Sequence, residues 1–376
     1  MTTFFYRRSF LFSFHRPQRW GSFIRSVFFV LFFWALVFFV FFTQSSLVWA
    51  GRKKGTQKNS GELTIRFFAA GHGDSTLVTT PQGHNILIDA GMGSWRKGDH
   101  LLERRLLPFF KKRGITRLDA FFVSHPHYDH LGDPRLLYRR VPFDRLFVNG
   151  DSAHFFNSRR ISFRDKKKKR VPMVVLKRGD ELRFGDVVFE VLHPFTKKRL
   201  SKRAWSIGSI NNRSMVIRIR YGDVSFLLPG DLCWTGERRL LRAGPLGRVN
   251  VLKLGHHGQG SASEELIREL KPEYAVLSCC DRPWYEKIPR AVRSRLRRHN
   301  VKMLRTDKHN DIIFRTDGVR LHVREEMDFR MLSAGHCVWA MRRGLIQRYS
   351  CRMSQRRKNR RLTGLVKRKK RTKRGI

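Results

Sequence analysis

Apolar residues recur along the middle of the chain in short runs separated by turns, a spacing typical of strands in a mixed α/β domain. These runs predict strands at residues 63–69, 85–89, 120–124, 145–148, 187–192, 214–220, 225–228, 249–254, 274–278 and 312–316. Longer amphipathic stretches predict helices near residues 98–113, 234–243, 263–270 and 287–299, with Ser263 as a capping start of the third. Strands mixed with helices in this way predict an α/β sandwich.

The first fifty residues differ from this middle. They hold five arginines and no acid, and an uninterrupted apolar run extends from Val27 to Phe42. Basic residues before such a run and small residues after it are typical of an export signal, here cut after Ala50. If the signal is not cut, residues 27–49 predict a single membrane anchor. In either case the body of the protein is expected to be exported to the periplasmic or extracellular side.

Charge divides the chain further. The net charge of the 376 residues is +48, and residues 331–376 carry sixteen Lys and Arg with no acid. Between residues 51 and 330, 57 basic residues against 30 acidic ones leave +27. A body this basic predicts a polyanionic partner, such as DNA or another anionic phosphate polymer, and no nucleotide cofactor is expected. The predicted organisation is a signal or anchor at 1–50, a linker at 51–60, one domain at 61–325 and a basic, disordered tail at 326–376.

A cluster of metal-binding side chains follows the strand predicted to end near Ser124. The run Ser-His-Pro-His-Tyr-Asp-His occupies residues 124–130. Imidazole and carboxylate groups are ligands of borderline divalent metals such as zinc. At the end of a strand, His125 and His127 can reach one ion, while Asp129 and His130 reach a second.

Two later segments place similar groups after apolar strands. Asp231 follows the strand at 225–228 and can bridge two ions. His256 and His257 follow the strand at 249–254 and lie between glycines, which allow close approach of the backbone. Because all three segments come after strands, the sequence predicts one shared metal site.

The order of these motifs resembles the metallo-β-lactamase superfamily, and in particular the C-terminal domain of the ComEC-type DNA-uptake competence proteins. Further matching segments are residues 67–75, 87–91, 211–216 and 304–307, so that the resemblance covers about residues 62–318. It implies a four-layer αβ/βα sandwich of the metallo-β-lactamase type, with the metals at one edge between two central sheets.

The resemblance also implies roles for the motif residues. One metal would be bound by His125 and His127, the other by Asp129 and His130, and Asp231 would lie between them. The implied cofactors are two divalent ions, zinc in the first place and manganese as the alternative.

The same resemblance assigns roles around these ligands. His256 is the expected ligand of the adjacent histidine pair, whereas His257 would contact the substrate or support the ligands and would act with Asp129 in catalysis. Outer residues expected to orient the ligands are Asp74, Asp89, Asn211 and Asn212.

The chain departs from the superfamily pattern at two places. The usual third-motif histidine is absent, and Asn211 and Asn212 stand in its place. His193 is either a substitute ligand or a structural histidine at a strand end. The late segment at residues 285–289 keeps a tyrosine and a proline but has lost its histidine, and Lys287 is a partial replacement.

The function implied is metal-dependent hydrolysis, with a metal-bridging hydroxide as nucleophile and Asp129 as the group that receives its proton. The strongly cationic surface favours a phosphodiester substrate, namely DNA in a competence-related role. Two alternatives stay open: a cell-wall phosphoesterase of the choline-phosphate esterase kind, and a non-catalytic receptor for DNA or another polyanion.

Overall fold

Two mixed β-sheets form the centre of the protein. The computed structural model describes residues 61–326 except 72, 94–100, 166, 202–205 and 279–289. The predicted signal or anchor, the linker, the tail beyond residue 326 and the segment around Lys287 therefore lie outside the described residues. In the part of the chain that is described, no helix is both long and apolar enough to cross a membrane.

The first sheet has eight strands in the order β15-β14-β1-β2-β3-β4-β5-β6. The half of the sheet from β3 to the edge strand β6 is parallel, whereas the other half, from β15 to β3, pairs antiparallel. The strands are β1 (Leu63–Phe67), β2 (Ser75–Thr79), β3 (Asn85–Ala90), β4 (Ala120–Val123), β5 (Leu146–Val148), β6 (Met173–Val175), β14 (Asp311–Thr316) and β15 (Leu321–Glu326).

The second sheet has seven strands in the order β13-β12-β11-β10-β9-β8-β7 and is parallel from β10 to β13. Its strands are β7 (Glu181–Phe184), β8 (Val187–His193), β9 (Val216–Tyr221), β10 (Val224–Leu228), β11 (Val251–Lys253), β12 (Tyr274–Leu277) and β13 (Lys302–Arg305).

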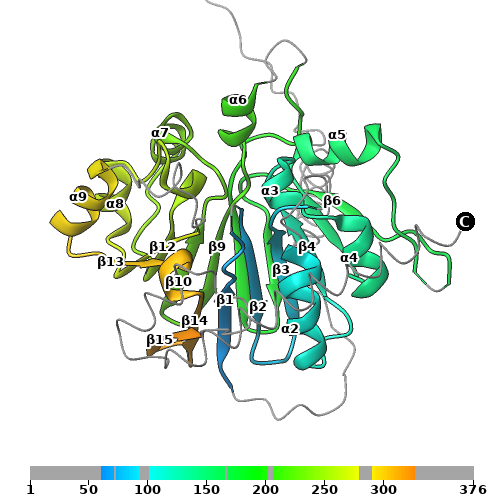
Figure 1. Ribbon diagram of the computed structural model, residues 1–376. Helices are drawn as coiled ribbons and strands as arrows, with labels where there is room; N and C mark the ends of the chain where they lie inside the picture. Colours follow the sequence, from blue (N-terminus) through cyan, green and yellow to red (C-terminus); the bar gives the residue numbers. More distant parts are fainter. Residues whose placement is uncertain are drawn as a thin grey trace, which may run out of the picture. The chain divides into compact units, whose positions relative to one another are not determined.

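Helices cover the outer faces of both sheets (Figure 1). The first sheet carries the π-helical turn η2 (Leu102–Leu106), α2 (Leu107–Lys112), α4 (Pro134–Arg140) and α5 (Gly150–Ser158). The second carries α7 (Trp234–Arg242), α8 (Glu264–Leu270) and α9 (Arg290–Arg298). Four short helical turns lie in connections: α3 (Tyr128–Leu131), α6 (Ile207–Asn211), η4 (Gly255–Gly258) and α10 (Thr306–His309).

The alternation of side chains along each strand explains the layers. On β4, Phe122 faces the second sheet and stacks on Phe147 and Phe189 at ring distances of 4.7 and 5.7 Å. Its neighbour Phe121 points the opposite way, into the apolar layer beneath the helices. Because successive strand residues face opposite sides, one buried strand fills two layers of core. The result is the predicted four-layer α/β sandwich, and the prediction of this fold is confirmed.

Each strand predicted from the sequence is present, with ends within two or three residues of those expected. The helices predicted at 234–243, 263–270 and 287–299 correspond to α7, α8 and α9, and Ser263 caps α8 by accepting a hydrogen bond from the Leu266 amide. The sequence reading missed β2, β6, β7, β13 and β15, as well as the helices α4 and α5.

Candidate metal centre

The predicted metal-binding segments meet at the carboxyl ends of strands from both sheets. The loop after β4 leads into α3, the loop after β10 carries Asp231, and β11 leads into η4. The two edges are held together by a hydrogen bond from the Met215 amide to the Ser124 carbonyl and by close packing of Gly230 on Ser124. Side chains far apart in the sequence are thereby placed around a common centre.

One group of possible ligands consists of His125, His127 and Asp231, whose ligand atoms lie within 4.8 Å of one another. The Nε2 atom of His125 is 3.0 Å from Nδ1 of His127 and 3.8 Å from Oδ2 of Asp231. His125 is fully buried and His127 is partly exposed, so the group opens to solvent on the His127 side.

A second group consists of Asp129, His130, Asp231 and His257, all buried. The Oδ1 atom of Asp231 is 3.1 Å from Nε2 of His130 and 3.7 Å from Nε2 of His257. Nε2 of His257 is also 3.4 Å from Oδ2 of Asp129. Asp231 belongs to both groups, which is the position of a bridging carboxylate.

The outer hydrogen bonds set the orientation of the imidazoles. Ser124 donates its hydroxyl proton to Asp89 at 2.7 Å, so its oxygen can only accept from Nδ1 of His125, 3.1 Å away. Nδ1 of His130 donates to Asp89 at 2.8 Å, and Nδ1 of His257 donates to the Ser278 carbonyl at 3.2 Å. The rings of His125, His130 and His257 therefore present Nε2 to the cluster, as is common in metal-bound histidines.

Asp74 supports the second group from behind. Its carboxylate forms an ion pair with the buried Lys253, and it lies 3.8 Å from Nδ1 of His130 and 3.7 Å from Nδ1 of His257. The Lys253 ammonium also donates to the Leu254 carbonyl at 2.9 Å. Asp74 and Asp89 thus lie against the Nδ1 atoms of these histidines.

The charges of the cluster favour a cation at its centre. Burial alone would lower the pKa of His130, but the Asp231 and Asp89 carboxylates hold that pKa well above its usual range. Burial would likewise lower the pKa of His257, and Asp231 raises it. Burial would raise the pKa of Asp231, but its histidine neighbours keep it well below the usual range. Positive charge is therefore stabilised where these carboxylates converge.

The arrangement also fits bound metal ions on geometric grounds. Nε2 of His130 and Oδ1 of Asp231 are buried and 3.1 Å apart, yet neither makes a well-directed hydrogen bond. A ring lone pair and a carboxylate oxygen at this distance need a proton or a cation between them. Burial lowers the pKa values of His125 and His127, so their facing nitrogens favour a metal over a second proton.

The structure exchanges the roles expected for the adjacent histidines. His257 enters the cluster, whereas Nδ1 of the half-buried His256 donates to the Gln259 carbonyl at 3.1 Å and lies 3.2 Å from the Cys233 sulfur. The preference for His256 as ligand thus disagrees with the geometry. Both residues have positive φ angles, 43° and 51°, so the backbone turns sharply here, and it is the His257 ring that points into the cluster.

The residues at the third-motif position lie outside both ligand groups. Asn212 accepts hydrogen bonds from the amides of Cys233 and Gly236 and thereby joins the end of α6 to the start of α7. Asn211 is buried beside it. His193 donates from Nδ1 to the Ser214 carbonyl at 2.8 Å, and burial lowers its pKa to about 4. Of its two predicted roles, the geometry favours the structural one.

Two backbone features bring the loops into contact. A Cβ at Gly73 would lie 2.3 Å from the Asp129 carbonyl oxygen, and its φ is 128°, so only glycine fits there. Asp89 adopts a φ of 54°, which strains a non-glycine residue by about 1–3 kcal/mol. The hydrogen bonds from Ser124 and His130 to Asp89 offset that strain.

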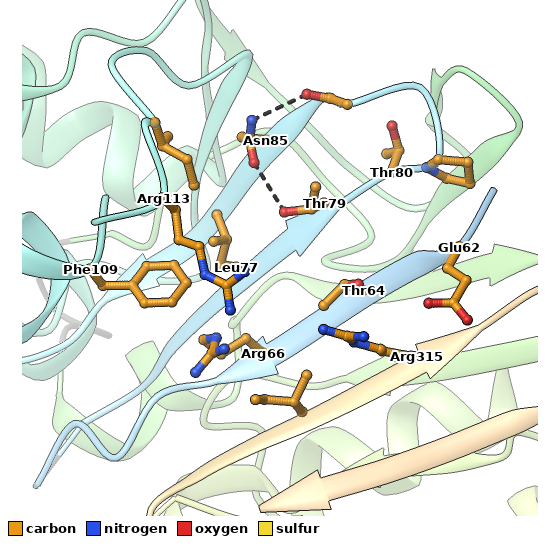
Figure 2. Close-up of a pocket in the computed structure, with 14 residues that line it drawn as sticks. Glu62, Thr64, Arg66, Leu77, Thr79, Thr80, Asn85, Phe109, Arg113 and Arg315 are labelled. Carbon is orange, nitrogen blue, oxygen red and sulfur yellow. Dashed lines mark hydrogen bonds between the residues drawn. The ribbon is translucent and has the colours of Figure 1, made fainter. Parts of the chain in front are cut away.

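A separate hollow lies on the outer face of β1, β2 and β14 (Figure 2). It has a volume of about 320 Å³ and is lined in part by Arg66, Arg113 and Arg315. Arg66 is already paired with Asp311 and Glu326 at 3.0 and 2.6 Å. None of the clustered histidines or aspartates lines this hollow, so it is distinct from the candidate metal centre.

The sequence pattern of the metallo-beta-lactamase superfamily matches residues 69–279, more than half of the chain. The chain therefore belongs to this superfamily, whose fold is associated with metal-dependent hydrolysis. A solved structure of similar fold is the metallo-beta-lactamase fold protein YhfI from Bacillus subtilis, with a TM-score of 0.42 and 12% identity, covering 68% of this chain and 100% of that one.

Among curated proteins, the chain is similar to two competence proteins. ComE operon protein 3 of Bacillus subtilis (strain 168) is 32% identical over 267 residues, which are 68% of this chain and 33% of that protein. Competence protein ComA of Neisseria gonorrhoeae is 28% identical over 258 residues, which are 68% of this chain and 32% of that protein. The chain thus spans about a third of the length of these relatives, and the predicted resemblance to competence proteins is confirmed.

Sequence reasoning missed one residue of the cluster, Lys253. Its position directly before Leu254 and Gly255, at the end of a buried strand, was the available signal, because a lysine at such a place needs a buried anion.

Proposed function

We propose that the protein is a metal-dependent phosphodiesterase that cuts DNA in a competence-related role. The observation that carries this proposal is the pair of ligand groups that share Asp231. Two divalent ions bound there would activate water as a nucleophile and neutralise the phosphate under attack. Zinc suits the mixed nitrogen and oxygen ligands, and manganese is the alternative.

In this proposal the residues of the two ligand groups bind the metal ions, and Asp129 and His256 have further roles. His125, His127 and Asp231 would hold one ion, and Asp129, His130 and His257 would hold the other with Asp231. Asp129 is 6% exposed and is the carboxylate of the cluster best placed to accept a proton during the reaction. His256 lies at the rim, where its ring can contact the substrate.

The net charge of the middle of the chain supports a polyanionic substrate. Residues 51–330 carry 57 basic and 30 acidic residues, which leaves +27, and such a surface attracts a phosphate polymer from a distance. The similarity to competence proteins supports DNA among such polymers. With the N-terminal segment as an export signal or anchor, the domain would meet DNA outside the cytoplasm.

The test is hydrolysis of bis-p-nitrophenyl phosphate and of single-stranded DNA by the full chain, across a series of divalent metals. We expect turnover that chelation abolishes and that Asp129→Ala removes. Asp133→Ala is the matched control, because Asp133 caps α4 four residues away and belongs to none of the ligand groups.

Three results would count against the proposal. Turnover unchanged in Asp129→Ala would show that the cluster does not catalyse the reaction. Cleavage of choline-phosphate esters without cleavage of DNA would favour a cell-wall phosphoesterase. DNA binding without turnover in any metal would favour a receptor.

A further inference from the structure

A groove lined by an exposed tryptophan lies among the helices of the second sheet. Its lining comes from α7, the start of α8 and α9, and its volume is about 550 Å³. These three helices lie on the outer side of the second sheet (Figure 1). The residues that matter here are Trp234, Arg238, Arg295 and Arg298.

Trp234 is held in place although 46% of it is exposed. Its indole Nε1 donates to the Ser261 carbonyl at 3.1 Å, and its amide donates to the Gly260 carbonyl at 2.7 Å. The Arg295 guanidinium lies 5.6 Å from the ring centroid and is itself fixed by the carbonyls of Ser261 and Ala262. A ring fixed in this way loses little conformational freedom when a flat ligand stacks on it.

Among the charged residues that line the groove, three are arginines and two are glutamates. The acid of α7, Glu237, is buried and accepts hydrogen bonds from the amides of Ala262 and Ser263, so the exposed charges of this helix are all arginines. Helix α9 carries five arginines and no acid. On the α8 side, Glu264 is paired with Arg298 at 2.6 Å, which leaves Glu265 as the opposing charge.

The groove is continuous in sequence with the metal centre. Trp234 follows the shared ligand Asp231 by three residues, and the carbonyls that fix its indole and its amide belong to the loop that begins with His256 and His257. The Cys233 sulfur, next to Trp234, lies 3.2 Å from Nδ1 of His256. Trp234 is thus linked through its neighbour Cys233 to His256 at the rim of the cluster.

We propose that this groove binds single-stranded nucleic acid, with one base stacked on Trp234 and the backbone phosphates beside Arg238 and the arginines of α9. Stacking requires a base with a free face, which a single strand offers and a closed duplex does not. This inference rests on the proposed function. It adds that the bound DNA is single-stranded and that it approaches the metal centre along this groove.

The hollow of Figure 2 shows why charge alone does not select a site. Its aromatic residue, Phe109, is already covered by the guanidinium groups of Arg66 and Arg113, at 4.5 and 5.7 Å from the ring centroid. Arg66 is also neutralised by two carboxylates. Trp234 has one such neighbour, Arg295, among the described residues, and keeps nearly half of its surface exposed.

The experiment measures binding of a fluorescent oligothymidylate to the full chain by anisotropy, in chelator so that no cleavage occurs. We expect Trp234→Ala to weaken binding about 5- to 100-fold, because base stacking on an aromatic contributes roughly 1–3 kcal/mol. Trp234→Phe should retain most of the affinity. Arg238→Ala should reduce the magnitude of the slope of log affinity against log salt concentration by about 1, which corresponds to the loss of one phosphate contact.

Arg315→Ala is the matched control for Arg238→Ala, because it also removes one arginine charge but Arg315 lies at the other hollow. Equal weakening by Arg315→Ala and Trp234→Ala, with melting temperatures unchanged, would overturn the proposal, as would wild-type affinity in Trp234→Ala. Hydrolysis of bis-p-nitrophenyl phosphate separates the two hypotheses. Turnover with Trp234-independent binding rejects the groove alone, and Trp234-dependent binding without turnover rejects the phosphodiesterase alone.

Discussion

The two sheets contribute to the candidate metal centre in different ways. The first sheet supplies His125, His127, Asp129 and His130 from one loop after β4, and each of them enters a ligand group. The second sheet supplies Asp231 and His257 from two separate loops, while His193 and His256, also at its strand ends, stay outside. The first edge is thus a local motif, whereas the second is assembled from distant segments.

This difference shows where the cluster depends on the tertiary structure. In the first loop, neighbours in sequence are neighbours in space, so the motif by itself indicates the ligands. In the second sheet, Asp74 and Asp129 come across from the first sheet to contact His257. The second edge therefore depends more on correct packing.

The largest effect is expected for Asp231→Asn, since this residue is shared by both groups. Hydrolysis should fall on the order of 10⁴-fold, because bound metal supplies several kcal/mol of charge stabilisation. Steady-state kinetics measure the loss. Asp223→Asn, at the exposed opposite end of β10, is the control, and equal activity of the two variants would refute a bridging role.

Lys253→Met should lower the free energy of unfolding by about 3–5 kcal/mol, because Asp74 would keep a buried charge without its ammonium partner. Urea unfolding measures the change, and the exposed Lys302→Met should stay within about 1 kcal/mol. Replacing both partners, in Lys253→Met with Asp74→Leu, should recover much of the loss. No recovery would mean that Lys253 stabilises the fold in some other way.

His193 predicts a pH dependence at the edge of the second sheet. Its pKa is about 4 in the folded protein and 6.5 ordinarily, so the unfolded chain takes up the proton first as the pH falls. Above pH 6.5 His193 is neutral in both states and does not lower the free energy of unfolding. Between pH 6.5 and pH 4 the free energy of unfolding falls by up to about 3 kcal/mol, because each pKa unit corresponds to about 1.36 kcal/mol. His193→Gln should flatten the stability of the protein between these pH values in urea unfolding. An unchanged slope would contradict this role.

The smallest expected effect is on metal affinity, and it comes from comparing substitutions of the adjacent residues His256 and His257. His257→Ala should weaken metal binding by at least the roughly 10-fold typical of lost supporting groups, whereas His256→Ala should leave metal content intact. Competition with a metal-binding dye measures both affinities. Should His256→Ala lose metal and His257→Ala keep it, the exchange of roles seen in the structure is refuted.

Much of the fold was predictable because buried strands are dense in apolar residues, as in β4 and β10. The missed strands are short or charged. β7 alternates exposed and buried residues as Glu-Leu-Arg-Phe, and β15 contains His322, Arg324, Glu325 and Glu326. Helix α5 was missed because glycine, serine and asparagine give it a weak intrinsic preference, and Phe156 secures it by packing on the core.

The sequence by itself determined which chemical groups follow which strands: the histidines and aspartate after β4, Asp231 after β10, and a histidine pair after β11. Only the tertiary structure decided that His257 enters and His256 stays at the rim, and that Lys253 lies beneath Asp74. The physical reason is that the two adjacent residues have left-handed backbone angles, which direct their rings differently, and that two of the three carboxylates around His257 come from the other sheet.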